Sequence, residues 1–415
     1  MMMVPDPRCS RAKKHVLAEI LTCLVAGYVT GHYTFRRCVE WCQRHIKFLR
    51  KGMRLENGIA SISTISRMLS SIDEELFLYA FMEWVGEMLN TQGLHIAIDG
   101  KAIKAALSKV KGGRTPMLLN AIEVATGLVL AQLPILNKDC EITKIPEMLK
   151  LLNIRDSIIT TDAIGTQTDI MKQIIKQGGH FVLMVKGNQP TAYDELVVLF
   201  NEMSRDAAIL AEGKTGFIHY DLLNQVDTSM SKEKNRDRYE TRVYQVCHDP
   251  TYVTKTHKEW SFVKTIGLCQ QLRILRIRDA DGNDITPNKQ VFLQSGTRRQ
   301  PKPGTGDRES SDYQIVGMVS DMILTAKEMG KTKREHWHIE NSLHHVLDDT
   351  LREDRSPAKK SKNNLALIRK FAYNILRLVS IQQKISRPNT SIMDLLSDDL
   401  SLLGAYIFTG IEALN

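Results

Sequence analysis

Three acidic residues stand where a protein could use them for chemistry. Asp99 ends the apolar run 94–98, and Asp162 ends a second run, 157–161. Glu340 lies far downstream, in a segment whose pattern predicts a helix over about 335–353. Two strand-end aspartates and a helical glutamate could hold two divalent metal ions, roughly 3.5–4 Å apart, over a phosphodiester. The pattern therefore points to metal-dependent phosphoryl transfer, provided that the three carboxylates converge.

The type of ligand indicates the type of ion. Carboxylate oxygens suit hard cations, so Mg²⁺ is expected, with Mn²⁺ as a possible substitute. A zinc hydrolase is an alternative, because His336 and Glu340 are four residues apart on the expected helix. The His-Glu-x-x-His signature is absent, since Glu335 precedes His336 and the next histidine follows after only two residues. An isolated aspartate before glycine, as at Asp99, is more often a turn residue than a ligand.

Basic and aromatic residues near these carboxylates could contact a polyanion. Lys101 and Lys104 follow the first aspartate and could meet phosphates, although a solvated strand edge would have the same pattern. On the expected helix, His344 and Asp348 follow the glutamate by four and eight residues, so all three lie near one face. Trp337 adds an aromatic side chain to the same two turns. This crowding is unusual for an exposed helix.

The elements that must position these residues follow a recognisable order. Strands are expected at 94–99, 117–124, 128–135, 157–162 and 180–185, with helices at 141–152 and 166–177. The resulting order β-β-β-α-β-α-β is that of the ribonuclease-H-like fold, within the α/β class. In such a sheet the first and fourth strands lie side by side. Asp99 and Asp162 would then be neighbours.

The remaining chain is expected to form four further parts. Helical periodicity from Val16 to Val25 and beyond predicts an all-α N-terminal domain, 1–92. The first part of the ribonuclease-H-like core would cover 93–200, and a β-rich insertion 201–312 would interrupt it. The core would be completed by 313–382, with helices at 315–329 and 364–382, and followed by a C-terminal tail, 383–415. Within the insertion, strands are expected at 216–222, 240–247, 261–269 and 291–294, and the charged stretch 229–242 is expected to be exposed.

Charge and composition limit the class of protein. The 415 residues carry 56 Lys and Arg against 47 Asp and Glu, a formal net charge of +9. Residues 1–60 hold eleven basic residues against four acidic ones, and residues 352–370 hold seven against two. Solvated helix faces would explain either cluster, but two clusters around a carboxylate site favour nucleic acid as the partner. Seven scattered cysteines without a Cys-x-x-Cys pair, and no apolar run long enough for a membrane span, predict a cytoplasmic protein without a membrane partner.

Several motifs together resemble one family of proteins. They are Ile98-Asp99-Gly100-Lys101, Asn120-Ala121, Cys140-Glu141-Ile142-Thr143, Thr161-Asp162-Ala163, Lys186-Gly187-Asn188-Gln189, Arg238-Tyr239-Glu240-Thr241-Arg242, His336-Trp337-His338-Ile339-Glu340-Asn341 and Arg352-Glu353-Asp354. With Asp6-Pro7-Arg8 and Asn57-Gly58-Ile59 upstream, the resemblance spans about residues 5–380. The chain resembles an insertion-sequence transposase of the DDE class, in the H-repeat-associated (ISAs-type) branch.

The resemblance implies a catalytic triad of Asp99, Asp162 and Glu340 with Mg²⁺. It implies cleavage at the ends of a mobile element and transfer of the 3′-OH ends into target DNA. Double-stranded DNA, as terminal inverted repeats and as target, would be the partner, and two ends would be joined by a homodimer. The resemblance also suggests DNA contacts for a further set of residues, namely Lys101, Lys104, Lys186, Asn188, Arg238, Arg242, Trp337 and His344.

Two alternatives stay open beside the active transposase. The chain departs from the branch's usual residues in Asn57–Thr64 and at His345 and Asp349, which would suit a catalytically inactive or domesticated DNA-binding protein derived from such an enzyme. A metal nuclease without strand transfer is the second alternative. The sequence does not distinguish these three possibilities.

Overall fold

The computed structural model divides into two compact units, of which the second is a continuous stretch inserted into the first. Unit 1 contains Met1–Ser157 and His336–Asn415, and unit 2 contains Ile158–Glu335. The structure describes residues 4–8, 13–103, 117–135, 141–213, 223, 225–234, 238–275, 311–355 and 361–408. No helix in these ranges is long and apolar enough to cross a membrane. Each unit is described by itself.

Unit 1 begins with helices only. They are α1 (Leu17–Val29), α2 (Phe35–Arg44), α3 (Ile46–Leu49), α4 (Ile62–Ser71) and α5 (Glu74–Gly86). The helical periodicity predicted for this region is confirmed, because the apolar face of α1 is buried. Gly31, with a φ of 81°, follows the end of α1. Asp73 caps α5 by accepting a hydrogen bond from the Leu76 N–H.

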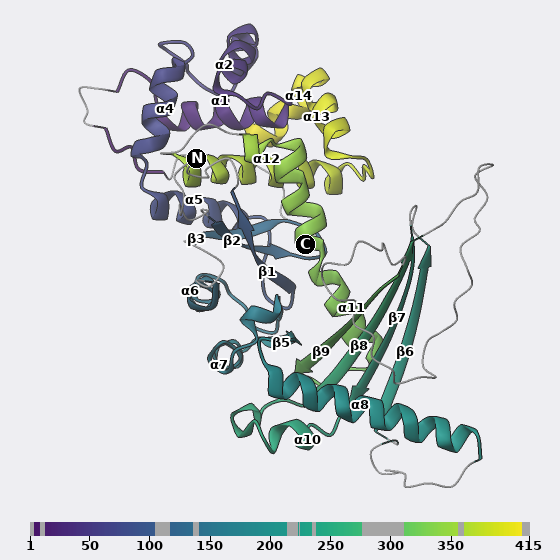
Figure 1. The fold of residues 1–415 in the computed structure, drawn as a ribbon. Helices are drawn as coiled ribbons and strands as arrows, with labels where there is room; N and C mark the ends of the chain where they lie inside the picture. The colour runs from purple at the N-terminus through teal and green to yellow at the C-terminus, as the bar shows by residue number, and fades with distance from the viewer. Residues whose placement is uncertain are drawn as a thin grey trace, which may run out of the picture. The chain divides into compact units, whose positions relative to one another are not determined.

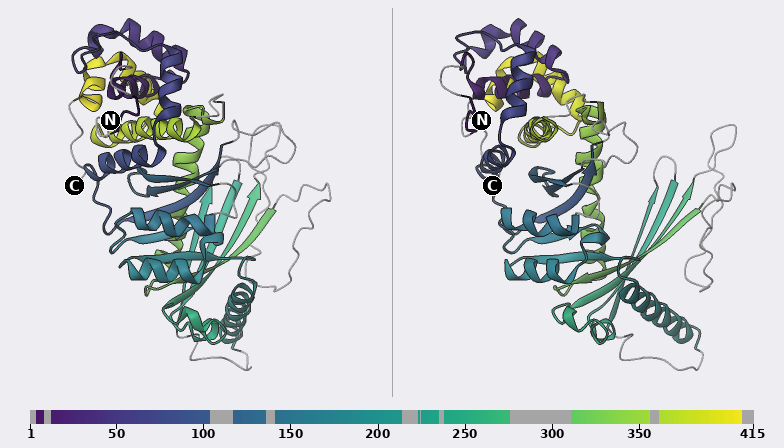
Figure 2. Two further views of the ribbon diagram at one scale, coloured as in Figure 1. Left: turned by 90° about the vertical axis from the view of Figure 1, so that its left-hand side faces the viewer. Right: turned by 60° about the vertical axis from the view of Figure 1, so that its left-hand side comes forward.

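A three-stranded antiparallel meander follows in unit 1. Its strands β1 (His95–Ala102), β2 (Met117–Glu123) and β3 (Val129–Ile135) lie in the order β3-β2-β1, and α6 (Glu141–Leu151) packs on β2 and β3. The long helix α12 (Lys362–Gln382) packs against β3, α1 and α5. In Figure 2, α12 (yellow-green) lies between the N-terminal helices (purple) and these strands (blue). Asn374 of α12 bonds both the N–H and the carbonyl of Val129, which occupies the open backbone groups of an edge strand.

The C-terminal part of unit 1 is helical as well. The helices α13 (Asn389–Asp398) and α14 (Leu400–Ile407) pack against α1 (Figure 1). The predicted C-terminal tail therefore begins with two helices. The strong helix expected at 364–382 is confirmed by α12, whose buried residues include Leu365, Ile368 and Phe371.

Unit 2 is built around a mixed sheet. Its strands are β4 (Ile158–Thr161), β5 (His180–Val185), β6 (Val226–Lys234), β7 (Arg238–Cys247), β8 (Thr265–Leu275) and β9 (Ser311–Ser320). They follow the order β4-β5-β9-β8-β7-β6, in which only β4 and β5 pair in parallel. The helices are α7 (Thr168–Lys176), α8 (Pro190–Ala211), α10 (Thr251–Thr254) and α11 (Ala326–His336), and α8 packs on β8 and β9 (Figure 1).

One prediction of local structure is wrong in unit 2, and another holds only in part. The segment 315–329, expected to be helical, begins as the end of strand β9, which pairs with β5 and β8, and α11 starts only at Ala326. Its apolar run fits a buried strand and a buried helix equally well, so distant partners decide. The charged stretch 229–242, expected to be exposed, lies mostly in β6 and β7, where Met230, Lys232 and Lys234 are exposed but Glu240 is buried. The strands expected at 216–222 and 291–294 lie outside the described residues, and the predicted domain boundaries stay a prediction.

The segment that carries Glu340 is not a regular α-helix. After α11 it continues as the π-helical segments η6 (Ile339–His344) and η7 (Val346–Thr350), followed by the short 3₁₀ turn η8 (Glu353–Arg355). The Leu351 N–H bonds the Val346 carbonyl, five residues back. π-Helical turns widen a helix and occur frequently at functional sites. The predicted helix over 335–353 is therefore present, with a different winding.

Candidate active site in unit 1

Asp99 lies on the strand β1, at the position that faces Asn120 of β2 in the register. The strand forms because Ile96, Ala97 and Ile98 are all buried, and they carry the aspartate into the interior with them. Only 8% of Asp99 remains exposed. A carboxylate in that position requires polar neighbours, because an unpaired buried charge is strongly unfavourable. The elements around Asp99 therefore decide what it can do.

Glu340 lies in η6, which packs directly against β1. The segment is anchored by Ile339 and Leu343, which are fully buried, whereas Glu340 itself is exposed. The two carboxylates thus differ in environment: Asp99 comes from a buried strand, and Glu340 from the solvent-facing side of the segment covering that strand. Asp99 and Glu340, two of the three residues singled out from the sequence, belong to elements that touch.

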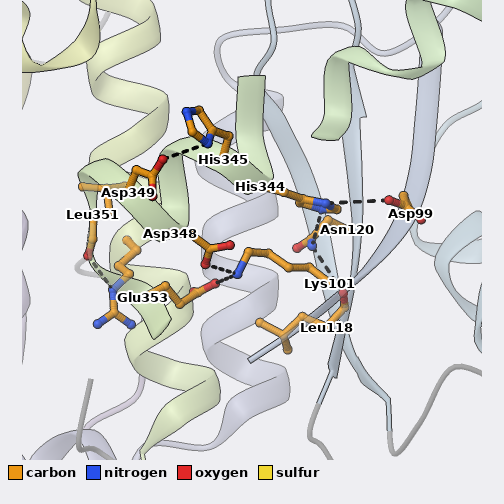
Figure 3. A network of polar contacts seen from close by, with 11 residues as sticks. Asp99, Lys101, Leu118, Asn120, His344, His345, Asp348, Asp349, Leu351 and Glu353 are labelled. Atoms are coloured by element: carbon orange, nitrogen blue, oxygen red, sulfur yellow. Dashed lines mark hydrogen bonds and ion pairs between the residues drawn. The ribbon is translucent and has the colours of Figure 1, made fainter. Parts of the chain in front are cut away.

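His344 links these two elements. Its Nδ1 lies 3.7 Å from Asp99 Oδ2, and its Nε2 lies 3.4 Å from the amide nitrogen of Asn120 (Figure 3). Burial, together with the nearby charges of Lys101 and Lys370, lowers the pKa of His344 to about 3. The imidazole is therefore neutral at neutral pH, so its contact with Asp99 is not an ion pair. The 3.7 Å separation is also too long for a hydrogen bond, and His344 acts here as a neutral packing neighbour.

Lys101 is the centre of a buried ion cluster next to Asp99. Its Nζ lies 2.6 Å from Asp348 Oδ1 and 2.9 Å from Glu353 Oε2, and Lys101 is only 6% exposed (Figure 3). Lys370 of α12 is buried on the same side and donates to Gln132 at 2.6 Å. We call Lys101, Asp348, Glu353 and Lys370 the Lys101 cluster. The ammonium that the sequence suggested for DNA phosphates is directed at two carboxylates of the protein.

The charges of the Lys101 cluster stabilise one another. Burial opposes the charge on Lys101, but Glu353 and Asp348 outweigh it, so the pKa of Lys101 is raised. Burial likewise opposes the charge on Glu353, but Lys370 and Lys101 outweigh it and lower the pKa of Glu353. For Lys370 burial wins, and its pKa falls to about 8 although Glu353 acts in the opposite direction. Burial also raises the pKa of Asp348, against the effect of Lys101.

Gly100 explains why glycine follows the aspartate. A Cβ at this position would overlap the carboxylate of Glu141, the buried first residue of α6. Because side chains alternate across a strand, Glu141 lies behind β1, on the face opposite to Asp99 and Lys101. Residue 100 must therefore lack a side chain for α6 to pack against the strand. The sequence offered no signal for Glu141 beyond its place in a motif.

Asp162 lies in unit 2, in a turn held by the motif 186–189. It follows β4, precedes the 3₁₀ turn η4 (Ala163–Gly165) and is half-buried. The Asn188 amide donates to the Ala163 carbonyl, and the Gln189 amide donates to the Thr166 carbonyl at 2.9 Å. Asn188, suggested as a DNA contact, therefore fixes the backbone next to the second aspartate. The neighbourhood of Asp99 and Asp162 stays a prediction.

The Arg-x-Glu-x-Arg motif forms a second buried ion cluster, in unit 2. Glu240 of β7 is 2% exposed and is bonded by both Arg238 and Arg242, while Arg273 of β8 lies 3.5 Å from it. Arg242 also bonds Glu233 of β6 at 3.2 Å. We call Glu240 with Arg238, Arg242 and Arg273 the Glu240 cluster. Of its guanidinium groups, that of Arg238 is the most exposed, at 40% of the side chain.

The donors near Asp99 fit a hard divalent cation. Asp99 supplies a carboxylate, the buried Oδ1 of Asn120 has no hydrogen-bond partner among the described residues, and Glu340 lies on the adjoining segment η6. Mg²⁺ prefers such oxygen ligands. Within the described ranges, however, no group of three or more His, Cys, Asp or Glu side chains is arranged to hold a metal ion. Unit 1 therefore offers part of an oxygen site, and a third carboxylate would have to come from elsewhere.

Comparison with known proteins identifies the family. Residues 90–375 match the family model described as "Transposase DDE domain", and residues 1–85 match the model "DDE_Tnp_1-associated". The chain belongs to the transposase DDE domain family. Asp99, Asp162 and Glu340 all lie within the part that matches this model. The resemblance drawn from the motifs is thereby confirmed.

Relatives of the same family match most of the chain. "Putative transposase YncI" of Escherichia coli O157:H7 is 30% identical over 90% of this chain and 85% of its own length. "H repeat-associated putative transposase YhhI" of Escherichia coli strain K12 is 28% identical, with 90% and 88% coverage. Among solved structures, a piggyBac transposase in a synaptic complex with hairpin DNA covers 92% of this chain and 70% of its own, with 11% identity and a TM-score of 0.40. A likeness of that degree carries no argument about this chain.

The residues suggested as DNA contacts differ in their environments. Lys101, His344 and Asn188 are directed at other parts of the protein, as described above. Arg238 and Arg242 bond Glu240, and Lys186 and Trp337 are half-buried. Lys104 lies outside the described residues. Among the described cations of 352–370, Arg352 and Arg355 are exposed, whereas Arg369 and Lys370 are buried in α12. Their roles in DNA binding stay predictions.

Proposed function

We propose that this member of the transposase DDE domain family cuts the ends of an insertion sequence and joins the 3′-OH ends to target DNA. The single observation that carries the proposal is the contact between β1 and η6 in unit 1, which brings the elements of Asp99 and Glu340 together inside a chain of this family. Asp162 would complete the triad from unit 2. We also propose that β1 to β5, with the intervening helices, correspond to a ribonuclease-H-like core.

Each acidic residue would have a defined role. Asp99 and Glu340, with Asp162, would hold Mg²⁺, or Mn²⁺ in its place. When bound, the two ions would activate the attacking oxygen and neutralise the leaving oxygen of an in-line displacement. Asp99 is fixed by its buried strand, so it would set the position of the donor set, while the exposed Glu340 would face the DNA. The neutral His344 would fill the space beside Asp99 and exclude water there.

The reaction would proceed as two phosphoryl transfers. In the first, a water oxygen attacks the phosphorus at the element end, the bond to the 3′ oxygen breaks, and that oxygen leaves as a 3′ hydroxyl after taking up a proton. In the second, the same 3′ oxygen gives up its proton, attacks a target phosphorus and displaces the target's own 3′ oxygen. Both steps break and form one P–O bond each, so no external energy source is needed.

The test uses the full chain with DNA that carries both ends of the element encoding it. The unmodified protein should cut these ends in Mg²⁺ and join them to a supercoiled target plasmid. Asp99→Asn, which keeps size and removes charge, should lose cutting by at least about a thousandfold because one ligand charge is gone, while DNA binding in a gel-shift assay remains.

Each other outcome has its own meaning. Cutting that persists in Asp99→Asn would overturn the assignment of this residue. End binding without cutting by the unmodified protein would instead support a catalytically inactive DNA-binding descendant. Cutting without joined products would indicate a nuclease that does not transfer strands.

A further inference from the structure

Two pairs of residues connect β1 to the segment that carries Glu340. Asp99 contacts His344, and Lys101 bonds Asp348 (Figure 3). On the strand, the two residues are two positions apart and face the same side, a separation of about 6.6 Å. On the helical segment, the two partners are four positions apart, about one turn. The two pairs therefore connect successive positions of the strand with successive turns of the segment, and we call them rungs.

The rungs fix where Glu340 stands. Strand and segment run in the same direction through the rungs, since 99 pairs with 344 and 101 with 348. One step back from the first rung leads to Glu340 on the segment and to Ala97 on the strand, and the two elements are in contact there. A slip by one helical turn would bring His344 or His336 to that level instead. The position of the glutamate therefore depends on the rungs that hold the register.

The two rungs differ in strength. The contact between Asp99 and His344 is 3.7 Å long, too long for a hydrogen bond, so it constrains the register weakly. The rung of Lys101 is an ion pair at 2.6 Å, and Glu353 at 2.9 Å binds the same ammonium. Glu353 lies beyond the end of η7, in η8, so the lysine holds two points of the segment. Of the two rungs, the one through Lys101 therefore gives the stronger directional constraint, in addition to the apolar anchoring by Ile339 and Leu343.

We propose that Lys101 is a positioning residue that sets the register of the Glu340 segment on β1, and that it does not contact DNA. The proposal rests on the proposed function, because it treats Asp99 and Glu340 as metal ligands. It explains why a cation stands two residues from an expected metal ligand, where its charge alone would weaken the binding of a second cation. Asp348 and Glu353 neutralise its charge, so its remaining effect is to hold the Glu340 segment in place on β1.

The direction in which Lys101→Met changes Mn²⁺ affinity distinguishes a positioning role of Lys101 from a purely electrostatic one. Mn²⁺ binding by the full chain without DNA is followed from the electron paramagnetic resonance signal of free Mn²⁺. In Lys101→Met, loss of a nearby positive charge alone would strengthen Mn²⁺ binding, whereas loss of the register should weaken it about tenfold or more, as for other residues that orient metal ligands. Unchanged or tighter binding would overturn the proposal.

A matched pair of variants covers the case in which Lys101→Met does not fold. Asp348→Asn and Asp349→Asn each remove one negative charge at adjacent positions, but only Asp348 bonds Lys101, and Asp349 pairs with His345 at 2.9 Å on the surface. Asp348→Asn should weaken Mn²⁺ binding several-fold more than Asp349→Asn. Equal effects would overturn the proposal.

The reference variant is Asp99→Asn. Mn²⁺ binding by the unmodified protein that does not depend on Asp99 would refute the metal site of the proposed function, and the positioning role with it. Asp99-dependent binding that is insensitive to Lys101 and Asp348 would refute only the positioning role. The melting temperature of every variant is recorded, so that global unfolding is recognised.

Discussion

The two buried ion clusters are built in opposite ways. In the Lys101 cluster a cation lies at the centre, with Asp348 and Glu353 around it, and no part of the ammonium faces solvent freely. In the Glu240 cluster a carboxylate lies at the centre, and Arg238 extends from it with a partly exposed side chain. The central lysine uses two of its three ammonium donors for carboxylates of the protein. An arginine at the rim has five donors and can bond a carboxylate and still offer donors outward.

This difference changes what the basic residues of the chain can do. Lys101, two residues after the proposed metal ligand Asp99, pairs with carboxylates in the interior, whereas Arg238 in unit 2 keeps a partly exposed charge. Buried pairs of this kind are not automatically stabilising, because desolvation offsets much of their attraction. Removing one partner is costly in either case. The comparison can be tested by removing the central or the peripheral residue of each cluster.

The largest effect is expected from removing the central carboxylates. Glu353→Leu removes the negative charge that favours the charged form of Lys370 and breaks one ion pair of Lys101, which should lower the free energy of unfolding by about 3–5 kcal/mol. Glu240→Leu should cost less, about 1–3 kcal/mol, because its arginines can turn toward water. Urea unfolding of the full chain, followed by circular dichroism, measures both. Equal losses would contradict the distinction between the clusters.

The next effect concerns pH and Lys370. Its pKa in the folded chain is about 8, below the ordinary value of about 10.4. Between these values the unfolded chain binds the additional proton, so the contribution of Lys370 to stability rises with pH, by at most about 1.4 kcal/mol per pH unit. Urea midpoints between pH 7.5 and 9.5 measure the slope. Lys370→Met should remove this slope, and a variant that retains it would refute the assignment to Lys370.

A smaller contrast separates two adjacent aspartates of the Glu340 segment. Asp348→Asn weakens a charged hydrogen bond to a buried ammonium and should cost about 1–2 kcal/mol. Asp349→Asn breaks only an exposed contact with His345 and should change stability by less than about 0.5 kcal/mol. Thermal unfolding of the two variants side by side gives the comparison. The reverse order would mean that the buried rung contributes little.

The smallest effect concerns DNA binding by the rim of the Glu240 cluster. If Arg238 contacts a phosphate, Arg238→Gln should reduce the salt slope of DNA binding by about 1 and weaken binding to all sequences alike. Lys101→Met should leave the slope unchanged, because its ammonium is buried. Fluorescence anisotropy with a labelled duplex at several salt concentrations measures both. A slope that changes only in Lys101→Met would invert the interpretation of the two clusters.

Local sequence patterns predicted the positions of the elements better than their type of secondary structure. The strands β2, β3 and β5 and the helix α12 follow the predicted ranges closely, because each carries an apolar pattern within a few residues. The strand β1 runs three residues past its predicted end, so Asp99 lies inside the strand and not at its end. The failure at 315–329 has a long-range cause. Residues 315–320 become a strand only through partners far away in the sequence, namely β5 and β8, which pair with β9. The π-helical winding around Glu340 had no local signal either.

The sequence by itself determined the family, the candidate acids and the element on which each acid stands, because motifs and periodicity are local properties. Only the tertiary structure decided the state of each charge. Lys101 reads as an exposed cation after a strand, yet Asp348 and Glu353, which lie 247 and 252 residues downstream, enclose it. Gly100 likewise reads as a turn residue, and only the packing of Glu141 shows why it must be glycine. Burial and charge pairing depend on which distant segments come together, and no local pattern carries that information.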